Sequence, residues 1–126
     1  MTNPLALIIE DDPYQATIFA EALQIAEFET QIVQDGQAAL TQLTTITPAV
    51  VILDLHLPQV SGQTVLQQIR ADKRLAKTRV LLATADALLA ETLQEQADLV
   101  LLKPISFHQL RDLAKRLRPP DITGLD

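Results

Sequence analysis

The sequence contains no cysteine, only three glycines and few aromatic residues (3%). Without cysteine, the chain has no disulfide framework, no thiolate zinc site and no thiol nucleophile. The scarcity of glycine leaves no glycine-rich loop that could hold a nucleotide's phosphates. A net charge of −6 and the few aromatic rings also disfavour nucleic-acid binding, which uses lysine and arginine against phosphates and aromatic rings against bases. We therefore expect no direct contact with nucleic acid.

No apolar run is long enough to cross a membrane, and residues 1–4 lack the basic segment with which a signal peptide begins. We therefore expect a cytoplasmic protein that makes no membrane contact. The chain does contain 48% hydrophobic and 21% charged residues, which is typical of a compact fold and argues against disorder. Its length of 126 residues fits one domain, which we place at residues 1–118, with residues 119–126 as a C-terminal tail.

Five short apolar segments predict the strands of one sheet. Four of them are continuously apolar, which is typical of parallel strands that are covered on both faces. The fifth, residues 28–33, alternates between apolar and polar residues and suits an edge strand. The four continuous segments are residues 5–9, 50–53, 80–83 and 99–102.

Segments of helical length lie between the predicted strands, and each begins with a residue that can cap a helix. We expect helices after Asp12, Asp35, Ser61, Asp86 and Ser106, ending near Ala26, before Thr47, near Ala71, near Gln96 and near Leu117. Because parallel neighbours need helical crossovers, five strands that alternate with five helices predict a doubly wound α/β domain.

Polar residues stand where the predicted strands end, and in an open parallel sheet ligands bind beyond these carboxyl ends. The residues are Glu10, Asp11 and Asp12, then Asp54, Thr84 and Lys103. Asp12 is interpreted as a helix cap, but the other carboxylates would repel one another unless a cation held them together. Oxygen ligands without histidine or cysteine suit Mg²⁺, which keeps water positions open for phosphate oxygens. With a lysine and a hydroxyl beside it, such a cluster can stabilise charge on a transferring phosphoryl group.

The order and spacing of these residues resemble the response-regulator receiver domain, the CheY-like family, up to about Arg118. The matching segments are residues 7–13, residues 51–58 with Gly62, Thr84-Ala85 and Lys103-Pro104. The resemblance implies a flavodoxin-like sheet in the strand order 2-1-3-4-5, flanked by five helices. It also implies a role in two-component signalling.

The resemblance assigns a role to each residue of the predicted site. Asp54 matches the phosphoacceptor, which would take a phosphoryl group from the phosphohistidine of a sensor histidine kinase or phosphotransfer protein. Asp11 and Asp54 would bind Mg²⁺ directly, Glu10 would act through water, and the backbone carbonyl of His56 would complete the metal shell.

Two further residues match the family's switch. Thr84 matches the hydroxyl residue that reaches the phosphoryl oxygen, and Lys103 matches its ion partner. In the family, both couple phosphorylation to a shift of the surface formed by the fourth helix, fifth strand and fifth helix. The position three residues before the lysine is commonly aromatic, but here it is Val100, so we expect no aromatic rotamer switch.

The segment from Thr84 to Lys103 is shorter than usual, and Gln96 replaces a common glycine. We therefore expect a short or displaced fourth helix. His56 and Asp86 occupy positions that tend to tune dephosphorylation in the family. His56 could also be a catalytic base or metal ligand, but His108, the only other histidine, is predicted far from the strand ends, so an exposed loop residue is the preferred interpretation.

Two other functions compete with the switch. A scaffold that is never phosphorylated is disfavoured by the intact site and stays open because of Val100. An aspartyl-nucleophile phosphatase would usually carry a second aspartate where this chain has His56. For the switch, we expect a downstream protein target unless the chain is part of a longer protein. The expected contact surface carries Arg111, Lys115 and Arg118 on the last helix.

Overall fold

The computed structural model describes residues 3–120. Within them, five strands form one parallel sheet in the order β2-β1-β3-β4-β5, which confirms the predicted fold class and strand order. The strands are β1 (Leu5–Ile9), β2 (Glu29–Val33), β3 (Val50–Leu53), β4 (Arg79–Thr84) and β5 (Leu99–Leu102). The last six residues of the expected C-terminal tail, 121–126, lie outside the described residues.

The helices begin where the sequence predicts them. They are α1 (Pro13–Ile25), α2 (Gly36–Leu43), α3 (Gly62–Ala71), α4 (Ala87–Leu93) and α5 (Phe107–Leu117), with 3₁₀ turns at Lys73–Leu75 and Gln94–Gln96. A side-chain oxygen just before each helix accepts a hydrogen bond from a backbone N–H of its first turn, as capping residues do. These caps are Asp12, Asp35, Ser61, Asp86 and Ser106.

One helix, α2, ends earlier than the sequence suggests. We expected α2 to continue to just before Thr47, but it stops at Leu43. The β-branched residues after it disfavour helix, and the hydroxyls of Thr44 and Thr45 donate back to the carbonyls of Thr41 and Gln42, which closes the helix end. The fourth helix is short, as expected, because its predicted last turn is 3₁₀.

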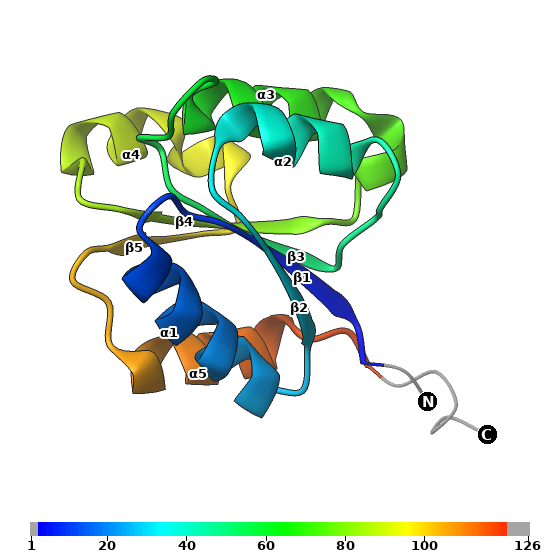
Figure 1. Ribbon diagram of the computed structural model, residues 1–126, viewed down its shortest axis with the longest axis vertical. Coiled ribbons are helices and arrows are strands. Elements are labelled where there is room, and N and C mark those ends of the chain that lie inside the picture. Colours follow the sequence, from blue (N-terminus) through cyan, green and yellow to red (C-terminus); the bar gives the residue numbers. More distant parts are fainter. Residues whose placement is uncertain (1–2, 121–126) are drawn as a thin grey trace.

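Helices cover both faces of the sheet (Figure 1). Helices α1 and α5 lie on one face, and α2, α3 and α4 lie on the other. Alternate residues of each central strand enter the two cores: Ala6 and Ile8 of β1 face α1 and α5, whereas Leu7 and Ile9 face the opposite layer. This double coverage explains why the predicted strands are continuously apolar.

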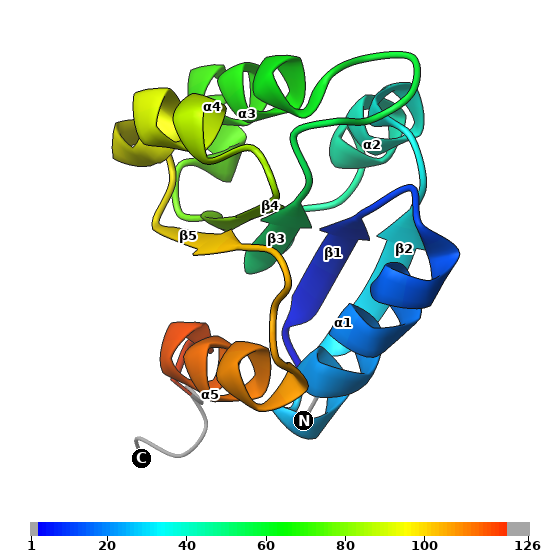
Figure 2. The ribbon, with the colours of Figure 1, turned by 90° about the vertical axis from the view of Figure 1, so that its left-hand side faces the viewer.

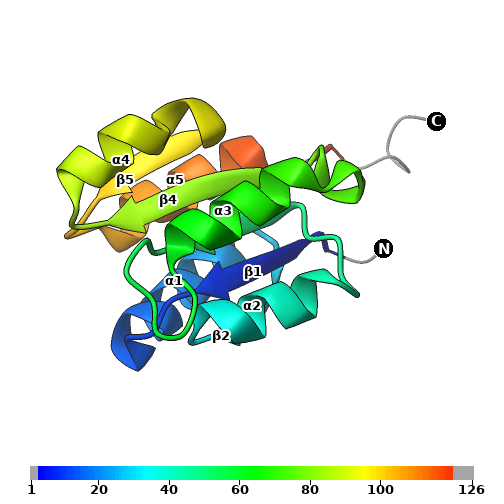
Figure 3. The same ribbon diagram turned by 90° about the horizontal axis from the view of Figure 1, so that it is seen from above.

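The carboxyl ends of the central strands lie at one edge of the sheet. Figure 2 shows the arrowheads of β1 and β3 at this edge, and Figure 3 shows β1 and β4 running in the same direction beneath α2 and α3. Polar residues that follow these strands therefore come together in space. Within residues 3–120, no helix combines the length and apolarity needed to cross a membrane.

Two glycines allow the loop after β3 to lie close to the sheet edge. The N–H of Gly36 donates to the carbonyl of Pro58 at 3.1 Å, and a Cβ added to Gly36 would lie 1.8 Å from the carbonyl oxygen of Val60. A Cβ added to Gly62 would lie 2.1 Å from the carbonyl oxygen of Asp54. Both contacts are backbone against backbone, so only glycine fits without moving the loop.

We predict that Gly36→Ala destabilises the domain, because its methyl group would force α2 and the loop at Val60 apart. The expected loss is about 1–3 kcal/mol of unfolding free energy, measured by urea denaturation. Gln37→Ala is the matched control, since Gln37 is the exposed neighbour in the same helical turn and its replacement should change stability by less than about 0.5 kcal/mol. Equal stability of the two variants would contradict the close packing at Gly36.

Candidate functional site

Backbone hydrogen bonds fix the residues that follow β3 and β5. The N–H of Asp54 donates to the carbonyl of Ile9 at 3.1 Å, which continues the pairing of β3 with β1 by one residue. The N–H of Lys103 donates to the carbonyl of Thr84 at 2.9 Å, which extends the pairing of β5 with β4 in the same way. The sheet itself therefore positions these two side chains.

A buried ion cluster joins three of the predicted site residues. The Nζ of Lys103 donates to Oε1 of Glu10 at 2.7 Å and to Oδ2 of Asp54 at 3.2 Å. The side chains are 15%, 1% and 9% exposed for Lys103, Glu10 and Asp54. Glu10 and Asp54, which lie 93 and 49 positions before Lys103 in the chain, thus share its ammonium group.

Burial and charge shift the protonation of this cluster in defined directions. Burial raises the pKa of Glu10 above its ordinary value, and the hydrogen bond from Lys103 opposes this effect without cancelling it. For Lys103, burial alone would lower the pKa, but the hydrogen bond to Glu10 and the charges of Asp54 and Glu10 outweigh burial and raise it. Lys103 is therefore a fixed cation at neutral pH.

Asp11 joins Glu10 and Asp54 in a group that fits a metal ion. One carboxylate oxygen from each residue can be chosen so that all three lie within 4.8 Å of one another. Asp11 is exposed, and among residues 3–120 its carboxylate has no hydrogen-bond partner. Three carboxylates against one ammonium leave an excess of negative charge, and their hard oxygens are the donors that Mg²⁺ prefers.

His56 and Thr84 lie at the same edge through different contacts. The backbone N–H of His56 donates to Oδ1 of Asp54 at 3.2 Å, so the loop after β3 runs beside the cluster. Thr84 is the last residue of β4 and is fully buried, and its Oγ1 accepts the N–H of Asp86 at 3.1 Å. The part of the chain that the structure describes contains no hydrogen bond between Thr84 and the carboxylates of the cluster.

One interaction at the site was not predicted from the sequence. Nε2 of His56 lies 2.9 Å from Oδ2 of Asp86 and bridges the loops that follow β3 and β4. The backbone N–H of Leu89 and this contact with His56 lower the pKa of Asp86. His56 is 67% exposed, as expected for a loop residue, but it has a partner. The sequence marks both positions, each two residues after a site residue, without showing that they meet.

Comparison with known proteins points to one family. The family described as response regulator receiver domain matches residues 6–115. The transcriptional regulator RpaA of Synechocystis sp., described as DNA-binding, is 34% identical over 85% of this chain and 46% of its own length. The sensor histidine kinase TmoS of Ectopseudomonas mendocina is 29% identical over 97% of this chain and 13% of its own length. The chain thus spans less than half of either relative.

Solved structures give the same fold. The response regulator receiver domain (CheY-like) from Methylobacillus flagellatus superposes with a TM-score of 0.82 and is 28% identical, over 93% of this chain and all of that one. The sheet order and the two helical layers seen here are therefore those of a CheY-like receiver.

We predict that Mg²⁺ stabilises the protein and that Asp11→Asn removes this effect. At about 100 times its dissociation constant, a ligand that binds only the folded state adds about 2.7 kcal/mol. Without Mg²⁺, Asp11→Asn should melt above the wild type, because it removes one of the repelling carboxylates. Thermal unfolding with and without MgCl₂ measures both effects.

The matched control is Asp12→Asn, which changes the adjacent carboxylate outside the cluster. Asp12 caps α1 by accepting the N–H of Tyr14, and asparagine caps a helix as well as aspartate does. This variant should keep the Mg²⁺-dependent rise in melting temperature. An undiminished rise in Asp11→Asn would show that the cluster does not hold the ion.

Proposed function

The chain belongs to the response regulator receiver domain family of two-component signalling, and on this premise we propose that it is a switch phosphorylated on Asp54. The family consists of signalling switches that interact with sensor histidine kinases. One observation carries the proposal: the buried carboxylate of Asp54 contacts Lys103 and belongs to the cluster with Glu10 and Asp11. In this proposal Asp54 is the nucleophile, Lys103 the fixed cation, and the acidic cluster the set of metal ligands.

The proposed reaction is transfer of a phosphoryl group from a phosphohistidine. An oxygen of Asp54 forms a bond to phosphorus while the bond between phosphorus and the donor's imidazole nitrogen breaks, and the imidazole leaves with the electron pair. A carboxylate is a weak nucleophile, so the reaction depends on positioning and on charge neutralisation. The backbone hydrogen bond from Asp54 to the carbonyl of Ile9 positions the nucleophile, and the ammonium of Lys103 would neutralise negative charge on the phosphoryl group.

The contacts of the acidic residues support different roles at the metal. Bound Mg²⁺ would neutralise the phosphoryl oxygens. Oε1 of Glu10 accepts from Lys103 and Oε2 accepts from the N–H of Asp12, so both of its oxygens are engaged and a role through water suits it. Asp11, with unengaged oxygens, suits direct binding together with Asp54. The backbone carbonyl of His56 is the remaining proposed metal ligand, and the backbone N–H of the same residue donates to Asp54.

Thr84 and Lys103 are the proposed route from the phosphoryl group to the rest of the domain. The hydroxyl of Thr84 accepts a bond from Asp86, which leaves its hydrogen to donate to a phosphoryl oxygen. Thr84 and Lys103 are also joined through their backbones. Val100 is half-buried against the core beneath α2, α3 and α4, so the transmitted shift is one of backbone and packing rather than of an aromatic rotamer.

We propose residues 1–118 as the receiver domain and residues 119–126 as its tail. The proposed partners are a sensor histidine kinase or phosphotransfer protein and a downstream protein target. Because such a kinase draws on ATP, the cytoplasm is the proposed location. The basic surface on α5 has weaker support as the target contact: Nε of Arg118 donates to the carbonyl of Glu27 and Nε of Arg111 to Asp112, so both are engaged within the domain.

We predict that acetyl phosphate with Mg²⁺ adds one phosphoryl group to the protein and none to Asp54→Asn. Intact-mass spectrometry measures the adduct. The matched control is Asp35→Asn, since Asp35 caps α2 through the N–H of Ala38 and an asparagine keeps that cap. An equal adduct on Asp54→Asn would exclude this residue as the acceptor. No adduct on a wild type that binds Mg²⁺ would favour a scaffold, and sustained turnover without an adduct would favour a phosphatase.

We predict that His56→Ala shortens the lifetime of the phosphorylated state severalfold. The imidazole of His56 and the carboxylate of Asp86 bridge the two loops beside Asp54, and their separation opens a path for water to the acyl phosphate. Asp86 is left unchanged because it caps α4. His108→Ala is the control, and its phosphorylated state should decay at the wild-type rate. Identical decay of the two variants would contradict a shielding role for the bridge.

A further inference from the structure

A concave surface lies at the opposite end of the sheet from Asp54. We call this cavity of about 1050 Å³ the basic pocket. It lies where the strands begin, since Leu5, Ala49 and Arg79 are among the residues that line it. The sheet therefore separates it from the carboxylates that follow the strand ends.

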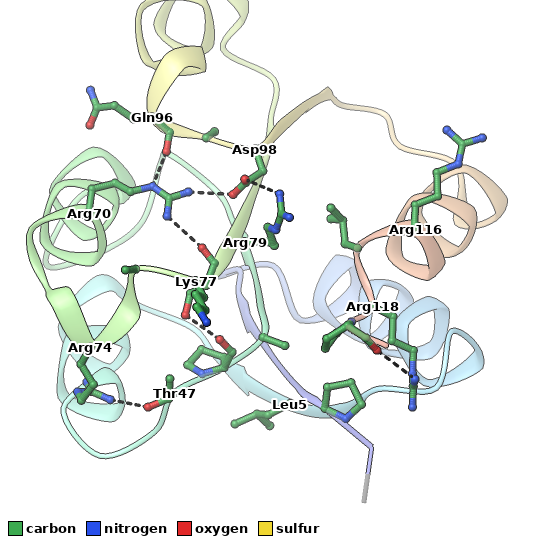
Figure 4. A pocket seen from close by; sticks show the side chains of 18 of the residues that line it. Leu5, Thr47, Arg70, Arg74, Lys77, Arg79, Gln96, Asp98, Arg116 and Arg118 are labelled. Carbon is green, nitrogen blue, oxygen red and sulfur yellow. Dashed lines mark hydrogen bonds and ion pairs between the residues drawn. The ribbon is translucent and has the colours of Figure 1, made fainter. Parts of the chain in front are cut away.

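The charge of the basic pocket is opposite to that of the whole chain. Its cations are Arg70, Arg74, Lys77, Arg79, Arg116 and Arg118, which are six of the ten lysines and arginines of a chain with a net charge of −6. Figure 4 shows Lys77 and Arg79 in the middle, Arg70 and Arg74 on one side, and Arg116 and Arg118 on the other. The described lining includes two carboxylates, Glu95 and Asp98.

Internal contacts fix part of this lining. Arg70 donates through Nε to the carbonyl of Gln96 at 2.7 Å and through Nη1 to the carbonyl of Thr78 at 3.0 Å. The carboxylate of Asp98 accepts from Arg70, Arg79 and the N–H of Val80, at 2.9, 3.3 and 2.7 Å. The charge of Asp98 is therefore already offset, and it does not compete with an incoming anion.

Two cations of the basic pocket remain available. Lys77 and Arg116 are exposed, and the side chain of neither forms an ion pair or hydrogen bond with another described residue. Lys77 precedes β4 and Arg116 is near the end of α5, so they approach the pocket from different segments (Figure 4). An anion between them would neutralise charge that the domain itself leaves unpaired.

The basic pocket also has apolar walls. Four of the chain's seven prolines line it: Pro4, Pro48, Pro119 and Pro120. Proline offers no N–H donor, so these walls suit aliphatic side chains rather than additional polar groups. The cavity volume of about 1050 Å³ matches the largest pockets that bind small ligands.

We propose that the basic pocket binds a short extended acidic segment of a partner protein, with two or three carboxylates separated by apolar side chains. Two of the carboxylates would meet Lys77 and Arg116, a third would lie near Arg79, which already pairs with Asp98, and the apolar side chains would contact the prolines. A long polyanion such as nucleic acid fits less well. Because the cations gather in the basic pocket, the remaining surface is more negative than the net charge of −6 suggests and would repel a chain that extends beyond the pocket. This interaction is independent of the proposed phosphorylation.

The test uses a fluorescein-labelled ELELE peptide and its uncharged counterpart QLQLQ, with binding measured by fluorescence anisotropy. The full chain should bind ELELE saturably, bind QLQLQ far more weakly, and lose affinity for ELELE as NaCl is added. In Lys77→Gln/Arg116→Gln the affinity should fall about fivefold or more, since this variant loses two ion pairs with the peptide. Asp54→Asn should bind like the wild type, which separates this test from that of phosphorylation.

The control variant Lys73→Gln/Lys115→Gln makes the same change in net charge with two exposed lysines outside the basic pocket. It should retain wild-type affinity, and an equal loss in both double variants would overturn the proposal in favour of long-range charge attraction alone. Absence of ELELE binding, or tighter binding of a labelled single-stranded DNA, would also overturn it. So would stronger peptide binding by Asp121→Asn/Asp126→Asn, because the chain's own C-terminal carboxylates would then be the occupant.

Discussion

The contact of Lys103 with Glu10 and Asp54 is the interaction on which the rest of the site depends. Burying two carboxylates and an ammonium together is tolerated only when their charges and hydrogen bonds offset the loss of water. Each of the three residues directly follows a strand. The sheet therefore places Nζ of Lys103 at 2.7 Å from Oε1 of Glu10 and at 3.2 Å from Oδ2 of Asp54. With Asp11, three carboxylates face one ammonium, so this sheet edge keeps a negative charge that a bound cation would neutralise.

The same sheet separates charge between its two ends. Carboxylates gather where the strands end, whereas six cations line the basic pocket where they begin. At the first end, Gly36 and Gly62 admit a loop that brings His56 beside Asp54. At the second, Arg70 ties α3 to the segments that flank β4 and β5. One architecture thus provides two chemically opposite surfaces.

Most of the fold could be predicted from local pattern. The continuous apolar strands and the caps before every helix are properties of neighbouring residues, and the structure has them where the sequence indicates. The predicted end of α2, just before Thr47, was wrong, because Thr44 and Thr45 end the helix earlier through their own hydroxyls. The pairing of His56 with Asp86 joins two loops 30 residues apart, and no local pattern encodes such a distance.

The sequence by itself determined the parallel sheet and which residues stand at its strand ends, because apolar continuity and capping act over a few residues. Only the tertiary structure decided which charges meet. It paired Lys103 with Glu10 rather than with Asp54 alone, bound Arg118 to the carbonyl of Glu27, and gathered six scattered cations around one cavity. Electrostatic interaction depends on distance in space, and strand order and helix packing set that distance.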